Sequence, residues 1–593
     1  MATVQRRSLF ILFVLWLVIY FASVFTPALL DDADTVHSEA AREMLTRHDW
    51  VTLYANGIRY LEKAPLMYWS VAASYTAFGI SEWTTRLPLM LGVLALIFTT
   101  YAAGCRCFGE RGGFYSGLVM ATSLGPYLFT RFLIPDVLVG LWLTLTFLFF
   151  LQTLDEDPPS RWACWGMAVA TALNVLTKGL IGLVFPVGVI GAYFLLTGNL
   201  MRGLRLRVIS STIVLFLIAA PWHILAGLRN PPQGNVRGFF WFYFVNEHFR
   251  RYIGTRVPHD YDKVPLVLFW ILLLLWLFPW IAFLPSSLRE VPLRWQEWRS
   301  RMTIRQRGNL LFFLWAVVIL TFFSFSTRQE YYTIPALPAM ALLVGGWLER
   351  EAETAADSRE RHSAITSSLV LFVIGGVGFV VAMLLLLSSK TPAPGSDLAD
   401  LLLKHPADYA LSFGHIFDLT PQALGAFRIP LLGAGLSVLL GTSFNWWFRK
   451  HNITQKANWA LALMMVVLFA CVHNAFVIFS PILSSKILAE AVGREYRLGD
   501  TIVVLGKYED ASTLNFYLHV PLHSLHEPAG NMWYGTQFPD APRVWETQTS
   551  FEELWKGAGR VFLWTEEEKP QPLKALEFRE IAHSGGKFIY SNH

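Results

Sequence analysis

Charged residues are scarce in this 593-residue chain. Only 15% of the residues are Asp, Glu, Lys or Arg, whereas 54% are hydrophobic and the mean hydropathy is +0.42. Soluble domains of this total length need a far more polar surface, so the composition argues against them. The net charge of +5 says little by itself. We expect no nucleic acid partner.

Cysteines are also few, and their spacing is uninformative. The four are Cys105, Cys107, Cys164 and Cys471, all in or beside apolar segments. A single residue separates Cys105 from Cys107, which matches neither a disulfide framework nor a common metal-binding motif. No internal repeat and no low-complexity tract stands out.

Long apolar stretches fill most of the chain instead. A stretch longer than about 18 residues can cross a hydrocarbon core roughly 30 Å thick. About thirteen spans are predicted, at residues 8–30, 87–107, 112–130, 135–153, 162–177, 180–197, 207–227, 265–288, 309–325, 330–348, 366–388, 427–447 and 457–479. The first is longer than a signal-peptide core and no small-residue cleavage site follows it, so it is predicted to be a retained anchor.

Basic residues cluster in every second connection between these spans. Arg6 and Arg7 precede span one, Arg106 and Arg111 follow span two, Arg202, Arg205 and Arg207 follow span six, Arg294, Arg299, Arg301, Arg305 and Arg307 follow span eight, and Arg449, Lys450 and Lys456 follow span twelve. Cytoplasmic loops carry such an excess of Lys and Arg, so the N-terminus is predicted to be cytoplasmic. An odd number of spans then places the C-terminal part outside.

The character of the sequence changes after residue 480. Residues 500–506 (DTIVVLG) and 560–565 (RVFLWT) are typical of short buried strands, and residues 512–519 favour a helix. The predicted fold is a polytopic α-helical membrane protein with a transmembrane domain at 1–480 and a small extracytoplasmic α/β domain at 481–593.

The first outer loop, residues 31–86, is dense in ionisable side chains. They are Asp31, Asp32, Asp34, His37, Glu39, Arg42, Glu43, Arg59, Glu62 and Lys63. Carboxylates at the mouth of a span are costly to desolvate and often mark a functional path, although a solvated loop is the simpler alternative. Residues 38–46 favour a helix whose apolar stripe, with Ala40 and Met44, suits the membrane surface.

The segment 59–69 (RYLEKAPLMYW) is the second landmark. Pro65 suits the first turn of a helix that continues through an apolar, aromatic stretch in the interface. Glu62 and Lys63 come just before that helix, where the free N–H groups favour an anion such as phosphate. The alternative is a lysine that extends toward lipid headgroups.

These motifs carry a family resemblance. Residues 31–44 (DDADTVHSEAAREM), Asp49-Trp50 and the segment 59–69 together resemble bacterial membrane glycosyltransferases of the GT-C class, in particular the aminoarabinose transferase (ArnT) and protein O-mannosyltransferase-like group. The resemblance covers most of the chain and weakens after the tenth span. It implies transfer of a sugar from a polyprenyl-phosphate carrier to lipid A, a protein or a surface glycan, outside a bacterial inner membrane and by an inverting single displacement.

The resemblance also implies roles for particular residues. The catalytic acid of the family falls on Ala33, between Asp32 and Asp34, so a shift of one residue is needed and Asp32 is slightly favoured over Asp34. A second family acid matches Asp136, for which a role at a helix N-terminus is the alternative.

The resemblance also implies roles for several cationic residues. Lys63, Lys178 and Arg251 are expected to contact the donor phosphate, because guanidinium and ammonium groups bind phosphate oxygens strongly. The supporting residues are Glu62, Arg59 and His248. Glu62 and His248 are also two candidate ligands for a divalent metal ion, fewer than such a site usually has.

Two other classes of function compete with the transferase. A lipid or sugar transporter (a flippase, for example) usually has charges near the membrane midplane and an inverted repeat, whereas here the charges concentrate in outer loops. A scaffold protein would tolerate alanine at Asp32, Asp34, Asp136 and Lys63.

Overall fold

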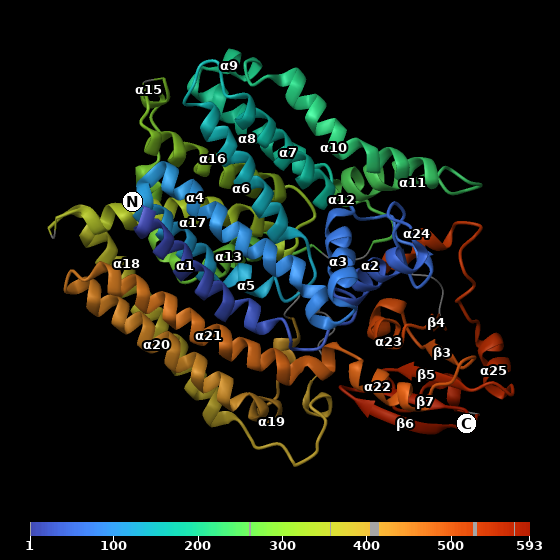
Figure 1. The fold of residues 1–593 in the computed structure, drawn as a ribbon. Helices are drawn as coiled ribbons and strands as arrows, with labels where there is room; N and C mark the ends of the chain where they lie inside the picture. The colour runs from blue at the N-terminus through green and yellow to red at the C-terminus, as the bar shows by residue number, and fades with distance from the viewer. Residues whose placement is uncertain are drawn as a thin grey trace.

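A computed structural model describes residues 2–259, 263–299, 301–355, 357–403, 414–525, 530–574 and 576–593. A bundle of long helices forms most of the molecule, and a small sheet lies at one end of it (Figure 1). The first outer loop, with helices α2 (Thr35–Arg47) and α3 (Leu66–Phe78), lies between the bundle and the sheet.

The apolar stretches form helices, as predicted. The long ones are α1 (Ala2–Ile19), α4 (Glu82–Thr122), α6 (Asp136–Thr153), α7 (Arg161–Lys178), α8 (Ile181–Thr197), α10 (Val208–Arg229), α13 (Leu266–Trp276), α16 (Ile304–Ser324), α17 (Leu337–Glu353), α18 (Arg359–Ser388), α20 (Arg428–Lys450) and α21 (Thr454–Leu483). In the described part of the chain, nine helices are long and apolar enough to cross a membrane by length and composition, or ten if a pair bent by 97° at residues 277–279 counts as one span. The chain is a multi-pass membrane protein.

The predicted number of thirteen spans is not established by these helices, although each predicted span overlaps one. Helix α4 covers two of the predicted spans. Its backbone breaks between them at Gly109, which has a φ of 80°. Helix α8 is apolar but has only 17 residues. Its length is at the lower limit for crossing a bilayer.

The helices differ in how far the protein encloses them. The segment that ends with α17 is almost wholly buried and packs along α4, whereas α10 and α18 are mostly exposed. Figure 1 shows α10 at one flank of the bundle and α18, α20 and α21 packed together at the other. Exposed apolar side chains on such flanks suit contact with lipid.

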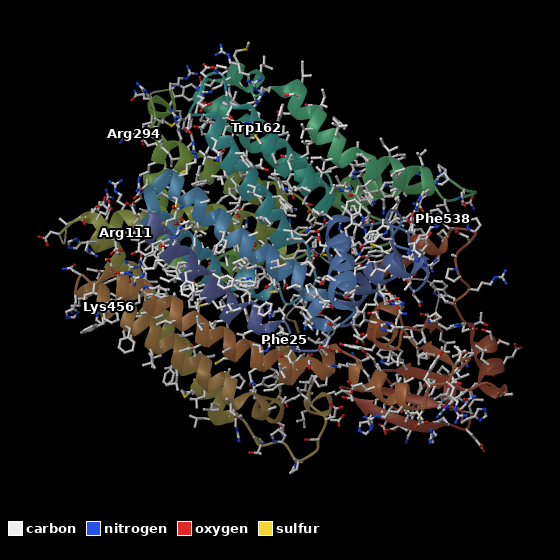
Figure 2. All side chains as sticks on the ribbon, viewed as in Figure 1. Phe25, Arg111, Trp162, Arg294, Lys456 and Phe538 are labelled. Carbon is white, nitrogen blue, oxygen red and sulfur yellow. The ribbon has the colours of Figure 1, made fainter. Side chains whose placement is uncertain are left out.

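Basic side chains and the sheet mark opposite ends of the bundle. Arg111, Arg294 and Lys456 lie at the left end in Figure 2, and Phe538 lies at the right, on the side of the sheet. All three basic residues come from connections that were predicted to be cytoplasmic.

The C-terminal part forms a mixed five-stranded sheet in the order β4-β3-β5-β7-β6. Its strands are β3 (Thr501–Val504), β4 (His523–Ser524), β5 (Val561–Thr565), β6 (Arg579–Ser584) and β7 (Lys587–Ser591), with helices α22 (Lys486–Glu495), α23 (Ser512–Leu518) and α25 (Gln548–Lys556). Strand β3 runs parallel to β4 and β5, whereas β7 runs antiparallel to β5 and β6. Both predicted strands and the predicted helix are confirmed.

The first outer loop folds against this C-terminal part. After α2, strands β1 (Tyr54–Ala55) and β2 (Ile58–Arg59) form a hairpin. Asn56 and Gly57 make its turn with φ angles of 52° and 76°, and Asn-Gly is the preferred pair for such tight turns.

Helix α2 lies on protein and not on the membrane surface, which corrects the prediction from its apolar stripe. Ala40 and Met44 are buried in one apolar cluster with Leu488, Tyr508 and Leu514 of the C-terminal part. An apolar stripe shows only that a face is covered, and here the C-terminal part covers it.

A buried ion pair fixes the contact between the two parts. The Asp31 carboxylate accepts hydrogen bonds from Lys587 Nζ at 2.9 Å, from the Thr513 N–H at 2.8 Å and hydroxyl at 2.6 Å, and from Ser485 Oγ at 3.1 Å. Both charged side chains are at most one-tenth exposed. Asp31 is therefore an anchor of the fold, next to the candidate residues Asp32 and Asp34.

We expect the substitution Asp31→Ala to lower stability by roughly 3–5 kcal/mol, because it leaves Lys587 buried without its carboxylate. Thermal unfolding of the detergent-purified protein, together with limited proteolysis of the C-terminal part, measures the effect. Asp157→Ala is the matched control, since the Asp157–Arg205 pair is exposed and should contribute less than about 1 kcal/mol. Equal shifts for the two variants would contradict the anchoring role of Asp31.

Candidate active site

A buried carboxylate, Glu62, lies at the centre of the charged residues. Lys63 Nζ and the Tyr60 hydroxyl lie 2.7 Å from Glu62 Oε1, and Arg256 Nη2 lies 2.7 Å from Oε2. Burial alone would raise the pKa of Glu62, but the charges of Lys63, Arg256 and Arg251 outweigh it and hold that pKa below its ordinary value. Glu62 is therefore ionised at neutral pH.

A second carboxylate, Glu247, extends the cluster into the segment between α10 and α13. It belongs to a segment, Trp241–Arg250, that winds as a π-helix, a form common at functional sites. Arg256 Nε lies 2.7 and 2.9 Å from its two oxygens, and Arg251 Nη1 lies 3.1 Å from one of them. The three cations thus face two carboxylates, which leaves one positive charge in excess.

The three cations differ in exposure. The Arg256 side chain is 7% exposed and is occupied by both carboxylates, whereas those of Arg251 and Lys63 are 23% and 30% exposed. Arg251 and Lys63 can therefore reach a ligand while Arg256 holds the carboxylates in place. A phosphate fits such a site because its oxygens accept several charge-assisted hydrogen bonds at once.

Asp136 and Lys178 form a second ion pair at the ends of two long helices. Asp136 begins α6, Lys178 ends α7, and Lys178 Nζ lies 2.6 and 2.5 Å from the two carboxylate oxygens. The ammonium group also lies 5.2 and 5.0 Å from the ring centres of Tyr331 and Tyr332. Lys63 and Arg251 lie near enough to act electrostatically on Asp136, so the two clusters share one region.

The structure separates the two candidate acids of the first loop. Asp34 is fully buried and accepts the backbone N–H groups of Leu30 at 3.1 Å and Leu133 at 2.8 Å, with Arg86 at 3.7 Å. Burial raises the pKa of Asp34, and Arg86 and the two N–H groups oppose that rise. Both oxygens of this carboxylate are therefore used in hydrogen bonds that stabilise the loop.

Asp32, in contrast, adopts a left-handed backbone with φ of 59° and is partly exposed. Aspartate adopts this conformation more often than most other non-glycine residues. The charge of Asp32 acts on Tyr60, which bonds to Glu62. The geometry therefore favours Asp32 over Asp34 as the acid that faces the cluster.

Arg59 and His248 have other partners. Arg59 pairs with Asp540 at 2.5 Å and donates to the Asn230 side chain at 2.7 Å, so it joins two outer segments. His248 accepts the Leu180 N–H on Nε2 at 3.1 Å and uses Nδ1 to donate to the Tyr243 carbonyl at 2.6 Å. Burial lowers the pKa of His248 to about 4, which keeps the ring neutral.

The suggested metal site between Glu62 and His248 does not fit these contacts. Both ring nitrogens of His248 and both oxygens of Glu62 are already engaged. Among the residues that the structure describes, no group of three or more His, Cys, Asp or Glu side chains converges as metal ligands would.

Several residues of the cluster were not predicted. Arg256, Glu247 and Tyr60 were not singled out, although Glu247 is next to His248 in the sequence and Tyr60 lies in the segment 59–69. Arg256 is 194 residues from Glu62 in the sequence, and only the fold brings them together.

Comparison with known proteins supports the resemblance. Residues 62–224 match the model of the dolichyl-phosphate-mannose-protein mannosyltransferase family. An undecaprenyl phosphate-alpha-4-amino-4-deoxy-L-arabinose arabinosyl transferase of Pectobacterium atrosepticum is 28% identical over 59% of this chain and 60% of its own length. The same enzyme of Aeromonas salmonicida is 31% identical over 52% of this chain and 54% of its own. The chain thus spans little more than half the length of these curated relatives.

The fold comparison covers the whole molecule. The crystal structure of ArnT from Cupriavidus metallidurans bound to undecaprenyl phosphate matches with a TM-score of 0.81 and 22% identity, over 98% of this chain and 97% of that one. The protein has the fold of the GT-C class of membrane glycosyltransferases. Its sequence is similar to the arabinosyl transferases named above, and its fold is similar to that of ArnT.

Acid should destabilise the protein partly through His37. This ring is buried, bonds to the Tyr68 hydroxyl at 2.8 Å, and has its pKa lowered to about 3 by burial and by Lys63, against the opposing charge of Glu62. In the unfolded chain the pKa is about 6.5. The unfolded state therefore binds more protons between these values, and stability falls as the pH drops below about 6.5.

The substitution His37→Gln, which keeps a hydrogen-bonding side chain, should make the melting temperature less sensitive to acid between about pH 7 and about pH 4. His362→Gln is the control, because His362 is exposed. Identical pH profiles for the wild type and His37→Gln would contradict this assignment.

Proposed function

We propose that this protein transfers a sugar from a polyprenyl-phosphate carrier to an acceptor at the outer face of the membrane. One observation carries the proposal: Lys63, Arg251 and Arg256 surround Glu62 and Glu247 with an excess of positive charge, beside Asp32 and Asp136. The names of the curated relatives support a sugar donor linked to undecaprenyl phosphate. The acceptor is lipid A, a protein or a surface glycan.

In the proposed reaction, Lys63 and Arg251 bind the phosphate of the donor. An acceptor oxygen attacks the anomeric carbon while the bond from that carbon to the phosphate oxygen breaks. The cations stabilise the negative charge that develops on the departing polyprenyl phosphate. Asp32 orients the acceptor and, if this is a hydroxyl, takes its proton. A single displacement of this kind inverts the anomeric configuration.

Asp136 and Lys178 have a supporting role in this proposal. Their mutual ion pair fixes the ends of α6 and α7 beside the phosphate site. Since their charges cancel, they add little to the net attraction for phosphate. Lys178 is thus proposed to shape the site, and Lys63 and Arg251 to bind the donor.

We also propose the location and the orientation. The basic loops with Arg111, Arg294 and Lys456 lie at the end opposite the sheet (Figure 2), which suits a cytoplasmic N-terminus and a periplasmic C-terminal part in a bacterial inner membrane. The division into a transmembrane domain at 1–480 and a periplasmic α/β domain at 481–593 belongs to the same proposal.

The substitution Lys63→Ala tests the proposal. With a purified polyprenyl-phosphate sugar and an acceptor, kcat/KM should fall roughly 10- to 100-fold, because a charge-assisted contact to phosphate is lost. The melting temperature should also fall, because Glu62 loses one of its two close cations, but the protein should still fold, since Arg256 continues to pair with Glu62. Mass spectrometry of the product measures transfer, and NMR should show an inverted anomeric configuration.

Lys456→Ala is the matched control, an exposed lysine at the far end of the bundle. Unchanged turnover of Lys63→Ala would remove Lys63 from the donor site. No transfer by the wild type with any polyprenyl-phosphate sugar would contradict the proposed function, and a retained configuration would contradict the single displacement.

Asp32→Asn and Asp34→Asn should affect different properties, the first the turnover and the second the stability. We expect Asp32→Asn to lower kcat by roughly 100- to 10,000-fold without loss of stability, since the acid acts in the reaction. Asp34→Asn should cost roughly 1–3 kcal/mol of stability, because an amide cannot accept both buried N–H groups. Kinetics and thermal unfolding of the two variants measure these effects, and the reverse pattern would exchange the two roles.

A further inference from the structure

An apolar groove lies between helices α1 and α21, which run side by side at the surface of the bundle (Figure 1). Its volume is about 330 Å³, and every described residue that lines it is apolar. The walls come from both helices and include Phe10, Val14, Val18, Trp459, Leu463 and Val466. Most of each helix is unburied, so the groove opens on a face that contacts lipid.

The groove follows the axes of the two helices. On α1 its residues recur at positions 10, 14 and 18, and on α21 at 459, 463 and 466, so each set lies on one face of its helix. Both helices begin at the end of the bundle opposite the sheet (Figure 1). With a rise of about 1.5 Å per residue, the stretch from 10 to 18 is about 12 Å long. An apolar groove of this length fits part of a lipid acyl chain and offers no bonds to a polar ligand.

A basic side chain lies at the end of the groove that is farther from the sheet. Arg7 is on the same face of α1 as Phe10 and Val14, one turn before the first residue of the wall. It is exposed and forms no ion pair in the part of the chain that the structure describes. The Ser8 hydroxyl donates to Glu110 of α4, which fixes the start of α1. A long basic side chain in such a place extends to the level of the lipid headgroups.

Trp459 is a second donor at the same end, on α21. Its ring forms part of the groove wall and lies 6.0 Å from the ring of Phe114, measured between centroids. Its indole N–H has no hydrogen-bond partner among the described residues. Tryptophan is enriched at membrane interfaces, where its apolar body contacts acyl chains and its N–H reaches polar groups. Arg7 and Trp459 thus offer a positive charge and a neutral donor where the groove meets the membrane surface.

These features favour a phospholipid over the other apolar occupants. The prenyl tail of a sugar donor would begin near Lys63, on the side of the sheet, and has no charge to match Arg7. Two copies of the chain paired through this face would bring their Arg7 side chains to the same level, where like charges repel. An anionic headgroup satisfies both donors while its acyl chain fills the groove.

We propose that this groove binds an anionic phospholipid from the leaflet at the basic end of the bundle. One acyl chain lies between α1 and α21, and the phosphate accepts hydrogen bonds from Arg7 and Trp459. The lipid thereby joins α1 to the group of packed helices α18, α20 and α21. This inference does not depend on the proposed transferase activity.

Titration of the delipidated protein in detergent with two phospholipids tests the inference, and native mass spectrometry measures the lipid bound. Phosphatidylglycerol and phosphatidylcholine with identical acyl chains differ in net charge. The wild type should bind phosphatidylglycerol roughly 5-fold more tightly, the ratio expected for one basic side chain at a headgroup. Arg7→Gln should remove most of this preference. Arg294→Gln should keep it, because Arg294 is at the same end of the bundle but does not line the groove.

Leu463→Trp tests the place of the acyl chain. Leu463 is exposed, so a larger side chain there fills the groove without disturbing the core. The variant should bind both lipids roughly 10-fold more weakly, because the chain can no longer be buried between the helices. Val467→Trp is the matched control, since Val467 is also exposed on α21 but does not line the groove. Elution volume and melting temperature verify folding, and Phe10→Ala, at an exposed position on the other wall, replaces Leu463→Trp if that variant does not fold.

Equal binding of the two lipids by the wild type would overturn the inference. So would a folded Leu463→Trp variant that binds lipid as the wild type does. Displacement of bound phosphatidylglycerol by an equimolar polyprenyl phosphate would assign the groove to a prenyl tail, and a dimer that Leu463→Trp dissociates would assign it to a second copy of the chain. Either result would also overturn the inference, and all of these outcomes leave the proposed sugar transfer to be judged by its own experiments.

Discussion

The site depends on one buried carboxylate with more cations than it can neutralise. Glu62 loses its hydration on burial, a cost that only close positive charges can offset. Lys63 and Arg256 provide these charges, each 2.7 Å from Glu62. Arg256 also pairs with Glu247, and both of these residues lie almost two hundred residues from Glu62 in the sequence. The need to neutralise Glu62 therefore brings the loop at residues 31–86 and the segment between α10 and α13 together. Because Glu247 attracts Arg251 as well, positive charge is left over where a phosphate can use it.

The rest of the outer structure keeps that cluster in place. Arg86 donates to the carbonyls of Val24, Pro27 and Ala28, which fixes the end of the first helix under the loop. Asp31 fastens the loop to the C-terminal part through Lys587. These contacts restrict the backbone on both sides of Asp32 and so hold this residue in its left-handed conformation.

Much of the fold could be predicted from hydropathy, and less of the site. Each predicted span overlaps a helix, because a long apolar stretch favours the helix, in which every backbone polar group can be paired without water. The strands around residues 502 and 562 were predictable because short buried runs leave a clear pattern. What covers the apolar face of α2 was not predictable, because periodicity shows that a face is buried and not what buries it. The different surroundings of Asp32 and Asp34 could not be predicted either, because moving one residue along this loop changes all the contacts that a side chain makes.

Residues far apart in the sequence were the hardest to assign. Arg256 has no motif of its own, and its role follows only from its contact with Glu62. Asp136 and Lys178 show the opposite case, since each was singled out in the sequence but their mutual pairing was not. That pairing determines where the site has an excess of positive charge. The pair at the ends of α6 and α7 is neutral as a unit, which suits a position beside apolar spans, where an uncompensated charge is expensive. The excess positive charge instead belongs to Lys63 and Arg251 in the connecting segments, whose side chains are 30% and 23% exposed and so remain within reach of water.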